Sequence, residues 1–363
     1  MRLSALLPQI LVRPRWAARA RTNPKRGTPA LVGRRRDALR SLAFAPVAFV
    51  LLLAAGWSAA ETFTPEITDT EYHHRLQVIR TAAASHPRNP LGVVIGSSRL
   101  VWGFRPETLP EPATGKTFWV NGSHVGNGPV LNRLTLHRLL RDGVWPDVAV
   151  IEVMPAFFVR ENARFVVGHF AASEMKMARG YGKFPLHFDY YFLLHRFARM
   201  TDLARAFDPF AGVTTLTPRG GHPKCEEDVT EAERERRTNV VRNVYKNDLA
   251  NMAVRPAADR AFRDMLGEAG RHGVRVVLIR TPEGPTFQSW YNPAGAAKFD
   301  AYLAGVAREF GTPILDARNW LDENDFFDSH HMLRRGGDKF TARFAREIAP
   351  IVGDAVPLAQ PKR

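Results

Sequence analysis

Two short polar blocks that lie far apart in the sequence contain the residue types of a nucleophilic catalytic site. The first is Gly96-Ser97-Ser98-Arg99, directly after the apolar run 91–95. A serine on the turn from a strand into a helix exposes its hydroxyl, and the start of the helix offers a backbone N–H group and positive potential to a developing oxyanion. Serine is also a favoured N-cap residue, so this block alone has a structural alternative.

The second block is Asp328-Ser329-His330-His331, shortly before the last predicted helix. An aspartate placed three residues before a histidine can orient the imidazole, which leaves the other ring nitrogen to take a proton from a nucleophile. Two alternatives are a loop with surface histidines and a metal site with Asp328, His330 and His331 as ligands. Adjacent histidines usually point apart and no further ligand cluster is near in the sequence, so we expect neither a metal nor another cofactor.

A third polar stretch, Asn121-Gly-Ser-His-Val-Gly126-Asn127-Gly128, follows another apolar run. Small residues at the carboxyl end of a strand allow the backbone to approach a ligand closely. The stretch has neither the GxGxxG pattern nor that of a P-loop, so nucleotide binding has little support. A plain glycine-rich turn is the alternative.

Five short apolar runs rich in β-branched residues alternate with helical stretches from residue 91 onward. Such runs are typical of a parallel sheet with helices on both faces, and they predict an α/β, flavodoxin-like doubly wound domain. The carboxyl ends of the strands border one crevice in such a sheet, so we expect the three polar blocks to converge there. A last helix is indicated by apolar residues that recur every four positions, Phe340, Phe344 and Ile348. The runs are 91–96, 117–120, 147–153, 275–279 and 313–315.

A mostly helical insertion is expected between the third and fourth runs, at about 156–272, within a domain that covers 91–352. Thr230-Glu-Ala-Glu233 has the spacing of a capping box and opens a charged helix. The segment 181–197 contains seven aromatic side chains, which predict either a buried helix or a platform for a glycan or membrane surface. Residues 353–363 are interpreted as a tail.

The amino-terminal end carries most of the positive charge of the chain. The formal net charge is +15, and residues 1–40 contain 11 Lys and Arg against one acidic residue, Asp37. The remaining chain is only mildly basic, which excludes a broad phosphate-binding surface, and we expect no nucleic-acid partner. A single cysteine excludes an intrachain disulfide framework.

An uncharged run follows at 41–60, and a run of about 20 apolar residues matches the roughly 30 Å hydrocarbon core of a bilayer. Arg34, Arg35, Arg36 and Arg40 precede it, so the positive-inside rule places the N-terminus in the cytoplasm and the rest of the chain outside. A cleaved signal peptide is the alternative, although the basic region before the run is long for one. We therefore interpret 1–40 as a cytoplasmic tail, 41–60 as a single transmembrane anchor, and 61–90 as a connecting segment with one helix at Tyr72–Ala84.

The order and strand context of the three polar blocks resemble the SGNH (GDSL-type) hydrolase superfamily of esterases and acyltransferases, over roughly residues 91–348. Gly96-Ser97-Ser98 stands where the family has its Gly-Asp-Ser block, which implies Ser98 as the nucleophile. Asp328-Ser329-His330-His331 matches the DxxH block, which implies His331 as the base and Asp328 as the residue that orients it. Gly126 stands where the family has its oxyanion-hole glycine.

The chain departs from the family pattern at two blocks. Ser97 replaces the usual Asp of the first block, and the stretch 150–155 lacks the asparagine that the third block usually supplies to the oxyanion hole. Asn121 and Asn127 are candidate substitutes. We assign Asn127 to the oxyanion hole with Ser98 and Gly126, and Asn121 to substrate binding. The chain is similar in this respect to the membrane-anchored branch that O-acetylates alginate or transfers D-alanine to teichoic acids.

Two arginines are further candidates for substrate binding. Arg99 follows the implied nucleophile and Arg280 ends the fourth apolar run. Either guanidinium can bind an anionic substrate group through two parallel hydrogen bonds. The alternative is a structural ion pair, for example with Glu152.

The resemblance and the anchor together predict a membrane-anchored serine esterase or O-acyltransferase that acts on acyl esters of an extracytoplasmic glycan or lipid. The expected partners are this acyl-ester or glycan substrate and the membrane, which is bound through 41–60. A membrane-bound acyl-donor protein is compatible with that location. The alternative function is a catalytically inactive glycan-binding or scaffold protein of an envelope polysaccharide export or modification machine, which the missing third-block asparagine favours.

Overall fold

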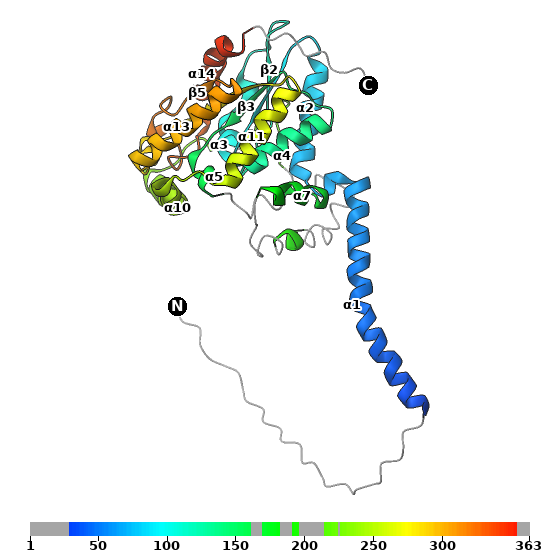
Figure 1. Ribbon diagram of the computed structural model, residues 1–363. Coiled ribbons are helices and arrows are strands. Elements are labelled where there is room, and N and C mark those ends of the chain that lie inside the picture. The colour runs from blue at the N-terminus through cyan, green and yellow to red at the C-terminus, as the bar shows by residue number, and fades with distance from the viewer. Residues whose placement is uncertain (1–28, 161–168, 182–190, 196–213, 224–225, 354–363) are drawn as a thin grey trace. The chain divides into compact units, whose positions relative to one another are not determined.

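The computed structural model describes residues 29–160, 169–181, 191–195, 214–223 and 226–353 (Figure 1). The chain divides into two compact units, residues 1–57 and 58–363. In its described part the first unit is a single helix, most of α1 (Pro29–Phe63). The second unit contains a β-sheet and the helices that cover it.

Helix α1 includes the predicted membrane anchor. Its segment Arg40–Phe63 has a mean hydropathy of 2.0, and large apolar side chains such as Leu42, Phe44 and Leu52 are exposed along it. The helix is therefore long and apolar enough to cross a bilayer. Pro46 lies inside the helix without ending it, as transmembrane helices tolerate.

Five parallel strands of the second unit form a sheet in the order β2-β1-β3-β4-β5. This is the order of flavodoxin-like doubly wound folds, in which the direction of winding reverses between β1 and β3. All five predicted apolar runs form strands, so the predicted fold class is confirmed. The strands are β1 (Leu91–Ile95), β2 (Phe118–Asn121), β3 (Val148–Glu152), β4 (Arg275–Arg280) and β5 (Ile314–Asp316).

Helices cover both faces of the sheet because successive strand residues point to opposite sides. Val93 and Ile95 of β1 pack with α2, α4, α11 and α13 on one face. Val94 packs on the other face with α3 and α14, the predicted last helix, which contributes Phe340 and Phe344. The covering helices are α2 (Thr70–Ser85), α3 (Ser98–Gly103), α4 (Pro129–Arg141), α11 (Pro256–Arg271), α13 (Pro293–Phe310) and α14 (Arg334–Val352).

The segment between β3 and β4 is mostly helical in its described part, with longer non-helical stretches at 214–223 and 226–230. Thr230 caps α10 as predicted, because its Oγ1 accepts the backbone N–H of Glu233 at 3.3 Å. Helix α11 packs on the sheet and against α4, so the helices that lie outside the layers of the sheet end before Pro256. Most of the aromatic segment 181–197 lies outside the described residues. The additional helices are α5 (Pro155–Val159), α7 (Ala172–Gly180), α10 (Glu231–Asn251) and α12 (Pro285–Gln288), with 3-10 turns η1 (Pro65–Ile67), η2 (Pro106–Thr108) and η3 (Glu323–Asp325).

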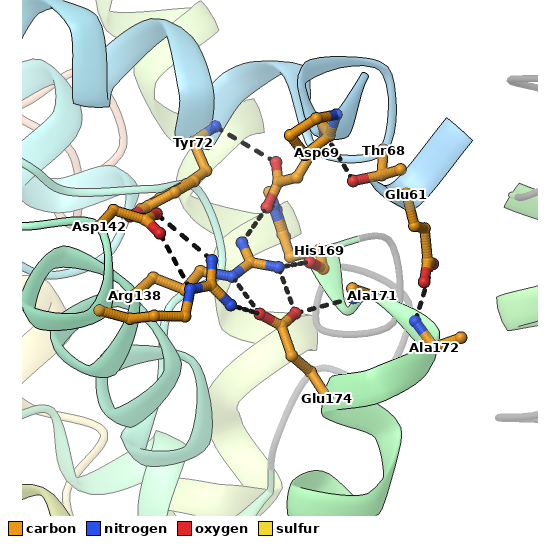
Figure 2. A network of polar contacts seen from close by, with 12 residues as sticks. Glu61, Thr68, Asp69, Tyr72, Arg138, Asp142, His169, Ala171, Ala172 and Glu174 are labelled. Atoms are coloured by element: carbon orange, nitrogen blue, oxygen red, sulfur yellow. Dashed lines mark hydrogen bonds and ion pairs between the residues drawn. The ribbon is translucent and has the colours of Figure 1, made fainter. Parts of the chain in front are cut away.

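A buried polar network joins the start of α2 to α4 and α7 (Figure 2). Arg138 of α4 donates from Nη1 to Asp69 Oδ2 at 2.6 Å and from Nε to Glu174 Oε1 at 2.8 Å. Asp69 also caps α2, and Tyr72 donates its hydroxyl to Asp142 at 2.7 Å. Arg138, Asp69 and Glu174 are all buried, so each charge depends on its partners for the solvation that water would give.

We expect Arg138→Met to destabilise the protein by about 3–5 kcal/mol, because Asp69 and Glu174 would remain buried after losing the buried cation that they share. Arg141→Met is the matched control. Arg141 also pairs with Glu174, at 3.0 Å, but its side chain is 46% exposed, so its loss should cost below about 1 kcal/mol. Denaturant unfolding of the purified full-length chain measures both variants, and equal effects would contradict the role given to Arg138.

The ion pair of Arg138 and Glu174 predicts a pH dependence of stability. Burial alone raises the pKa of Glu174, but hydrogen bonds and the charge of Arg138 outweigh it, so the pKa lies below the usual 4.5. A lowered carboxyl pKa contributes stability that is present above the usual value and is lost as the pH falls through the folded-state value. Without Arg138, burial is no longer outweighed and raises the pKa of Glu174 in the folded variant. The penalty of Arg138→Met should therefore start to shrink above pH 4.5, as this carboxyl takes up a proton, and shrink further as the pH falls through the lowered pKa of the wild type.

Candidate active site

Ser98, His331 and Asp328 lie in one hydrogen-bonded series at the carboxyl edge of the sheet. Ser98 Oγ is 2.9 Å from His331 Nε2, and His331 Nδ1 is 2.7 Å from Asp328 Oδ2. Ser98 follows β1, and the other two residues lie in the loop before α14, so the predicted convergence of the two blocks occurs. A hydroxyl, an imidazole and a carboxylate in this order can activate the hydroxyl as a nucleophile.

The two adjacent serines of the first block differ in their contacts. Ser97 is the N-cap of α3, and its Oγ accepts the backbone N–H of Arg99 at 3.3 Å. Ser98 is the first residue of the helix, and its hydroxyl faces His331. The capping role that is the structural alternative for this block therefore belongs to Ser97, and Ser98 contacts the imidazole.

The backbone of the second block holds Asp328 against His331. Ser329 has φ +60°, an uncommon value for a residue other than glycine. The turn brings two backbone N–H groups, those of His330 and His331, to Asp328 Oδ1 at 3.0 and 2.6 Å. One carboxylate oxygen is thus fixed by the main chain, and the other is left for the His331 ring.

The two histidines of the block have different environments, which contradicts the alternative of a loop with surface histidines. His330 is fully buried, and its ring stacks on Phe287 with centroids 4.8 Å apart. Both of its ring nitrogens are buried and have no hydrogen-bond partner among the described residues. Burial, with the nearby charges of His331 and Arg99, therefore holds the pKa of His330 well below its usual value. His331 is only partly buried and carries the contacts to Ser98 and Asp328.

The glycine-rich stretch after β2 is tied to the serine turn. The backbone N–H of His124 donates to Gly96 O at 2.9 Å. Gly126 has φ +79°, which a residue with a Cβ rarely adopts. Asn127 is buried and donates from Nδ2 to Asn132 Oδ1 at 3.1 Å, which leaves its second amide hydrogen for another acceptor.

Asn121 does not have the geometry of a substrate-binding residue, contrary to our expectation. It is fully buried, and its Nδ2 donates to the carbonyl oxygens of Leu100 and Phe104 at 2.8 and 2.9 Å. Its Oδ1 accepts the backbone N–H of Ser123 at 3.0 Å. These bonds fasten the end of β2 to α3, so Asn127 is the remaining candidate for the missing third-block asparagine.

The two arginines form buried ion pairs, so the structural alternative describes them better than substrate binding. Arg99 is fully buried, and its Nη2 donates to the carbonyl oxygens of Thr281 and Pro282 at 3.0 and 2.7 Å. Its guanidinium also lies 3.7 Å from Glu152 and 3.4 Å from Glu283. Arg280 is paired with Asp300 at 2.6 Å.

Glu152, which we had considered only as a partner for the arginines, supports the turn that carries Ser98. Its Oε2 accepts the backbone N–H of Ser97 at 2.5 Å, and its Oε1 accepts the hydroxyl of Thr281 at 3.0 Å. A Cβ on Gly96 would lie 2.6 Å from Glu152 Oε2, so this close approach requires glycine. The Glu152 carboxylate at the end of β3 therefore fixes the backbone of Ser97, next to the proposed nucleophile.

Three partly exposed rings were not predicted, of which two lie beside His331 and the third lies beside Trp102. The ring of Trp102 lies 4.9 Å from that of His331, and Phe327 stacks on His331 at 5.4 Å and 10°. His222 lies 6.3 Å from Trp102. The spacing of Ser98 and Trp102, four residues apart on α3, was a usable signal, because such residues share one face of a helix.

Comparisons with known proteins find a matching protein-family model and similar solved structures. A protein-family model matches residues 230–353, which include Asp328 and His331. No curated protein matches the chain. The chain is similar to a solved Bacteroides fragilis structure named as an acylhydrolase, at 11% identity and a TM-score of 0.37, with 77% of this chain and 98% of that one covered.

The chain is also similar to a catalytic mutant of an acetylxylan esterase from Geobacillus stearothermophilus, at 12% identity and a TM-score of 0.32, covering 72% and 94% of the two chains. A second mutant of that esterase gives 12% identity and a TM-score of 0.30, with 72% and 96% covered. At these identities and TM-scores the similarity supports no functional conclusion. We therefore infer the function from the side chains of the site.

Proposed function

We propose that the protein is a membrane-anchored serine esterase or O-acyltransferase that acts on acyl esters of an extracytoplasmic glycan or lipid. The observation that supports it most is the hydrogen-bonded series from Asp328 through His331 to Ser98. Each member has one contact that suits its role. The carboxylate of Asp328 is fixed by main-chain donors, and the imidazole of His331 contacts both the carboxylate and the hydroxyl. The hydroxyl of Ser98 lies at the start of a helix.

The reaction begins when Ser98 Oγ attacks the acyl carbonyl carbon and its proton passes to His331 Nε2. Asp328 stabilises the resulting imidazolium through Nδ1. The carbonyl oxygen becomes an oxyanion, for which the backbone N–H groups of Ser98 and Gly126 and the side chain of Asn127 are the proposed donors. The N–H of Ser98 is suited to this because the first N–H groups of a helix have no partner within the helix.

Collapse of this intermediate breaks the ester bond. The leaving alcohol takes the proton from His331 and the acyl group stays on Ser98. His331 then removes a proton from the acceptor, which attacks the acyl-enzyme and releases Ser98. Water as acceptor gives hydrolysis and a sugar hydroxyl gives transfer, so one site serves both reactions.

We expect a fluorophosphonate probe to label the wild-type protein at Ser98, because the probe reacts with serines that a neighbouring base activates. Ser98→Ala should abolish the labelling. Ser97→Ala is the matched control and should keep it, at a cost of about 1 kcal/mol in stability from the lost helix cap. Mass spectrometry of the labelled peptide measures the site. An adduct on Ser97, or labelling of Ser98→Ala, would contradict the assignment, and absence of any labelling would favour the inactive scaffold.

The proposed membrane topology has one crossing, with the N-terminus in the cytoplasm. Arg40 marks the start of the apolar part of α1, and Arg34, Arg35 and Arg36 precede it. Positive residues flanking an apolar helix are retained on the cytoplasmic side. Residues 61–363, and with them Ser98, would then lie outside the cytoplasm.

External protease added to spheroplasts is expected to degrade the domain that follows α1 and to spare an epitope placed at the N-terminus. Replacing Arg34, Arg35, Arg36 and Arg40 by glutamine should weaken this orientation, because it removes the charge bias beside the helix. Protection of the C-terminal domain in intact spheroplasts, followed by digestion after lysis, would contradict the topology.

A further inference from the structure

Two partly exposed rings next to the proposed base, Trp102 and Phe327, form a defined surface with His222, which lies beside Trp102; we call this surface the aromatic rim. Trp102 lies 4.9 Å from His331 and 6.5 Å from Phe327 between ring centroids. Other aromatic side chains nearby, such as Phe104 and Phe326, are fully buried in the core. The rim therefore exposes ring surface to solvent at the position where a substrate must approach Ser98.

Polar groups border the rim on the side of Phe327. The guanidinium of Arg237 lies 5.3 Å over the ring of Phe327 and is held by Glu226 and Glu233, each at 2.6 Å. Arg237 is partly exposed, and Glu226 is exposed. A flat apolar surface bordered by hydrogen-bonding groups suits a ligand with an apolar face and a polar edge.

The surroundings of Ser98 disfavour a long alkyl chain. Leu100, Val101 and Phe104 of the same segment are packed in the core with at most 2% exposure. A Cβ on Gly103 would lie 2.5 Å from Met332, so α3 packs closely on the loop that carries His331. Beneath the serine turn lie the buried, paired charges of Glu152 and Arg99, which offer no apolar surface to an acyl tail.

We propose that Trp102, with Phe327 beside it, is the stacking surface for the pyranose ring that carries the scissile ester, so that the substrate is a sugar with a short acyl group. The inference rests on the proposed function. The C–H face of the pyranose packs on the indole, its hydroxyls reach the polar groups beside Phe327, and the acyl carbonyl is directed to Ser98.

The test compares Trp102→Leu with the wild-type full-length protein on three esters: an O-acetylated methyl pyranoside, ethyl acetate and ethyl octanoate. Leucine keeps apolar bulk beside His331 and removes the flat ring. Trp320→Leu is the matched control. Trp320 is also partly exposed, but it contacts Phe340 and Arg343 of α14.

We expect Trp102→Leu to raise KM for the sugar ester about tenfold, the equivalent of about 1.4 kcal/mol, with little change in kcat or in its pH profile. KM for ethyl acetate should stay unchanged, and Trp320→Leu should behave as wild type. An equal loss on the sugar ester and on ethyl acetate would overturn the proposal, because Trp102 would then only support His331. A selective loss on ethyl octanoate would overturn it in favour of an alkyl-binding surface.

A binding measurement separates this proposal from the proposed function. Saturation-transfer NMR with the same methyl pyranoside is carried out on Ser98→Ala, and on Ser98→Ala combined with Trp102→Leu or Trp320→Leu. Loss of the signal in the Trp102 combination alone supports the stacking surface even if no variant shows turnover, a result that would refute the esterase instead. A signal unchanged by Trp102→Leu, or absent from Ser98→Ala, would overturn the proposal.

Discussion

Replacing His331 by alanine is expected to lower the turnover of an acyl ester by about 10⁴- to 10⁶-fold, as loss of the base does in other serine triads. His331 Nε2 is 2.9 Å from Ser98 Oγ, and no other base contacts this hydroxyl among the described residues. Without the imidazole the proton of Ser98 has no acceptor at the site. Turnover of an acetyl ester by the purified full-length protein measures the loss, and circular dichroism checks that the fold is kept.

Variants of two other histidines serve as controls for His331→Ala. His272 is exposed at the end of α11, and His272→Ala should leave turnover unchanged. His330→Phe should lose far less than His331→Ala, because a phenyl ring can keep the packing on Phe287 and Tyr245. Phenylalanine is the better test than alanine here, since His330→Ala would leave a cavity in a fully buried position. Equal losses at positions 330 and 331, together with inhibition by a chelator, would indicate a metal site instead.

The fold could be predicted from the sequence because its signals are local and repeat along the chain. Five β-branched runs separated by helices require a parallel sheet with two covered faces, and β1 to β5 form at those runs. The capping box at Thr230 and the spacing of Phe340 and Phe344 also act within one helix. The packing of helix α11 against α4 and the sheet is a tertiary property, which the sequence pattern of the segment 156–272 does not indicate.

The site was predictable to the extent that the topology brings short motifs together. Ser98 follows β1, and the loop with Asp328 and His331 lies at the same edge of the sheet, so their contact follows from strand order. The substrate role given to Arg99 could not be tested in the sequence. Its carbonyl partners and Glu283 come from the segment after β4, and Glu152 comes from the end of β3, so they meet Arg99 only in the fold.

The buried residues next to the site could be predicted least well from the sequence. The spacing from Asp328 singles out His331 as the base, but it does not show that His330 is buried, which depends on Ser329 at φ +60° and on the packing of Phe287. In the sequence, Glu152 is likewise only the last residue of a predicted strand. Its role appears only when its carboxylate meets the backbone of Ser97.

Asp328→Asn is expected to lower turnover by about 10⁴-fold, although the change is nearly isosteric. The backbone N–H groups of His330 and His331 both donate to Oδ1 of Asp328, so the single oxygen of an asparagine will occupy that position. Its NH₂ group then faces His331 Nδ1, where a carboxylate oxygen lies at 2.7 Å in the wild type. An NH₂ donor at this place requires Nδ1 to be an acceptor, which puts the ring proton on Nε2.

The predicted consequence is a wrong tautomer in an intact site. With a proton on Nε2, His331 cannot accept the proton of Ser98, so both turnover and the rate of fluorophosphonate labelling should fall together. Asp316→Asn is the matched control, because Asp316 is a 45% exposed carboxylate at the end of β5 that pairs with Arg318. That variant should keep full turnover. A loss below about tenfold for Asp328→Asn would show that the carboxylate does not set the tautomer of His331, since the wrong tautomer in a serine triad costs about 10⁴-fold.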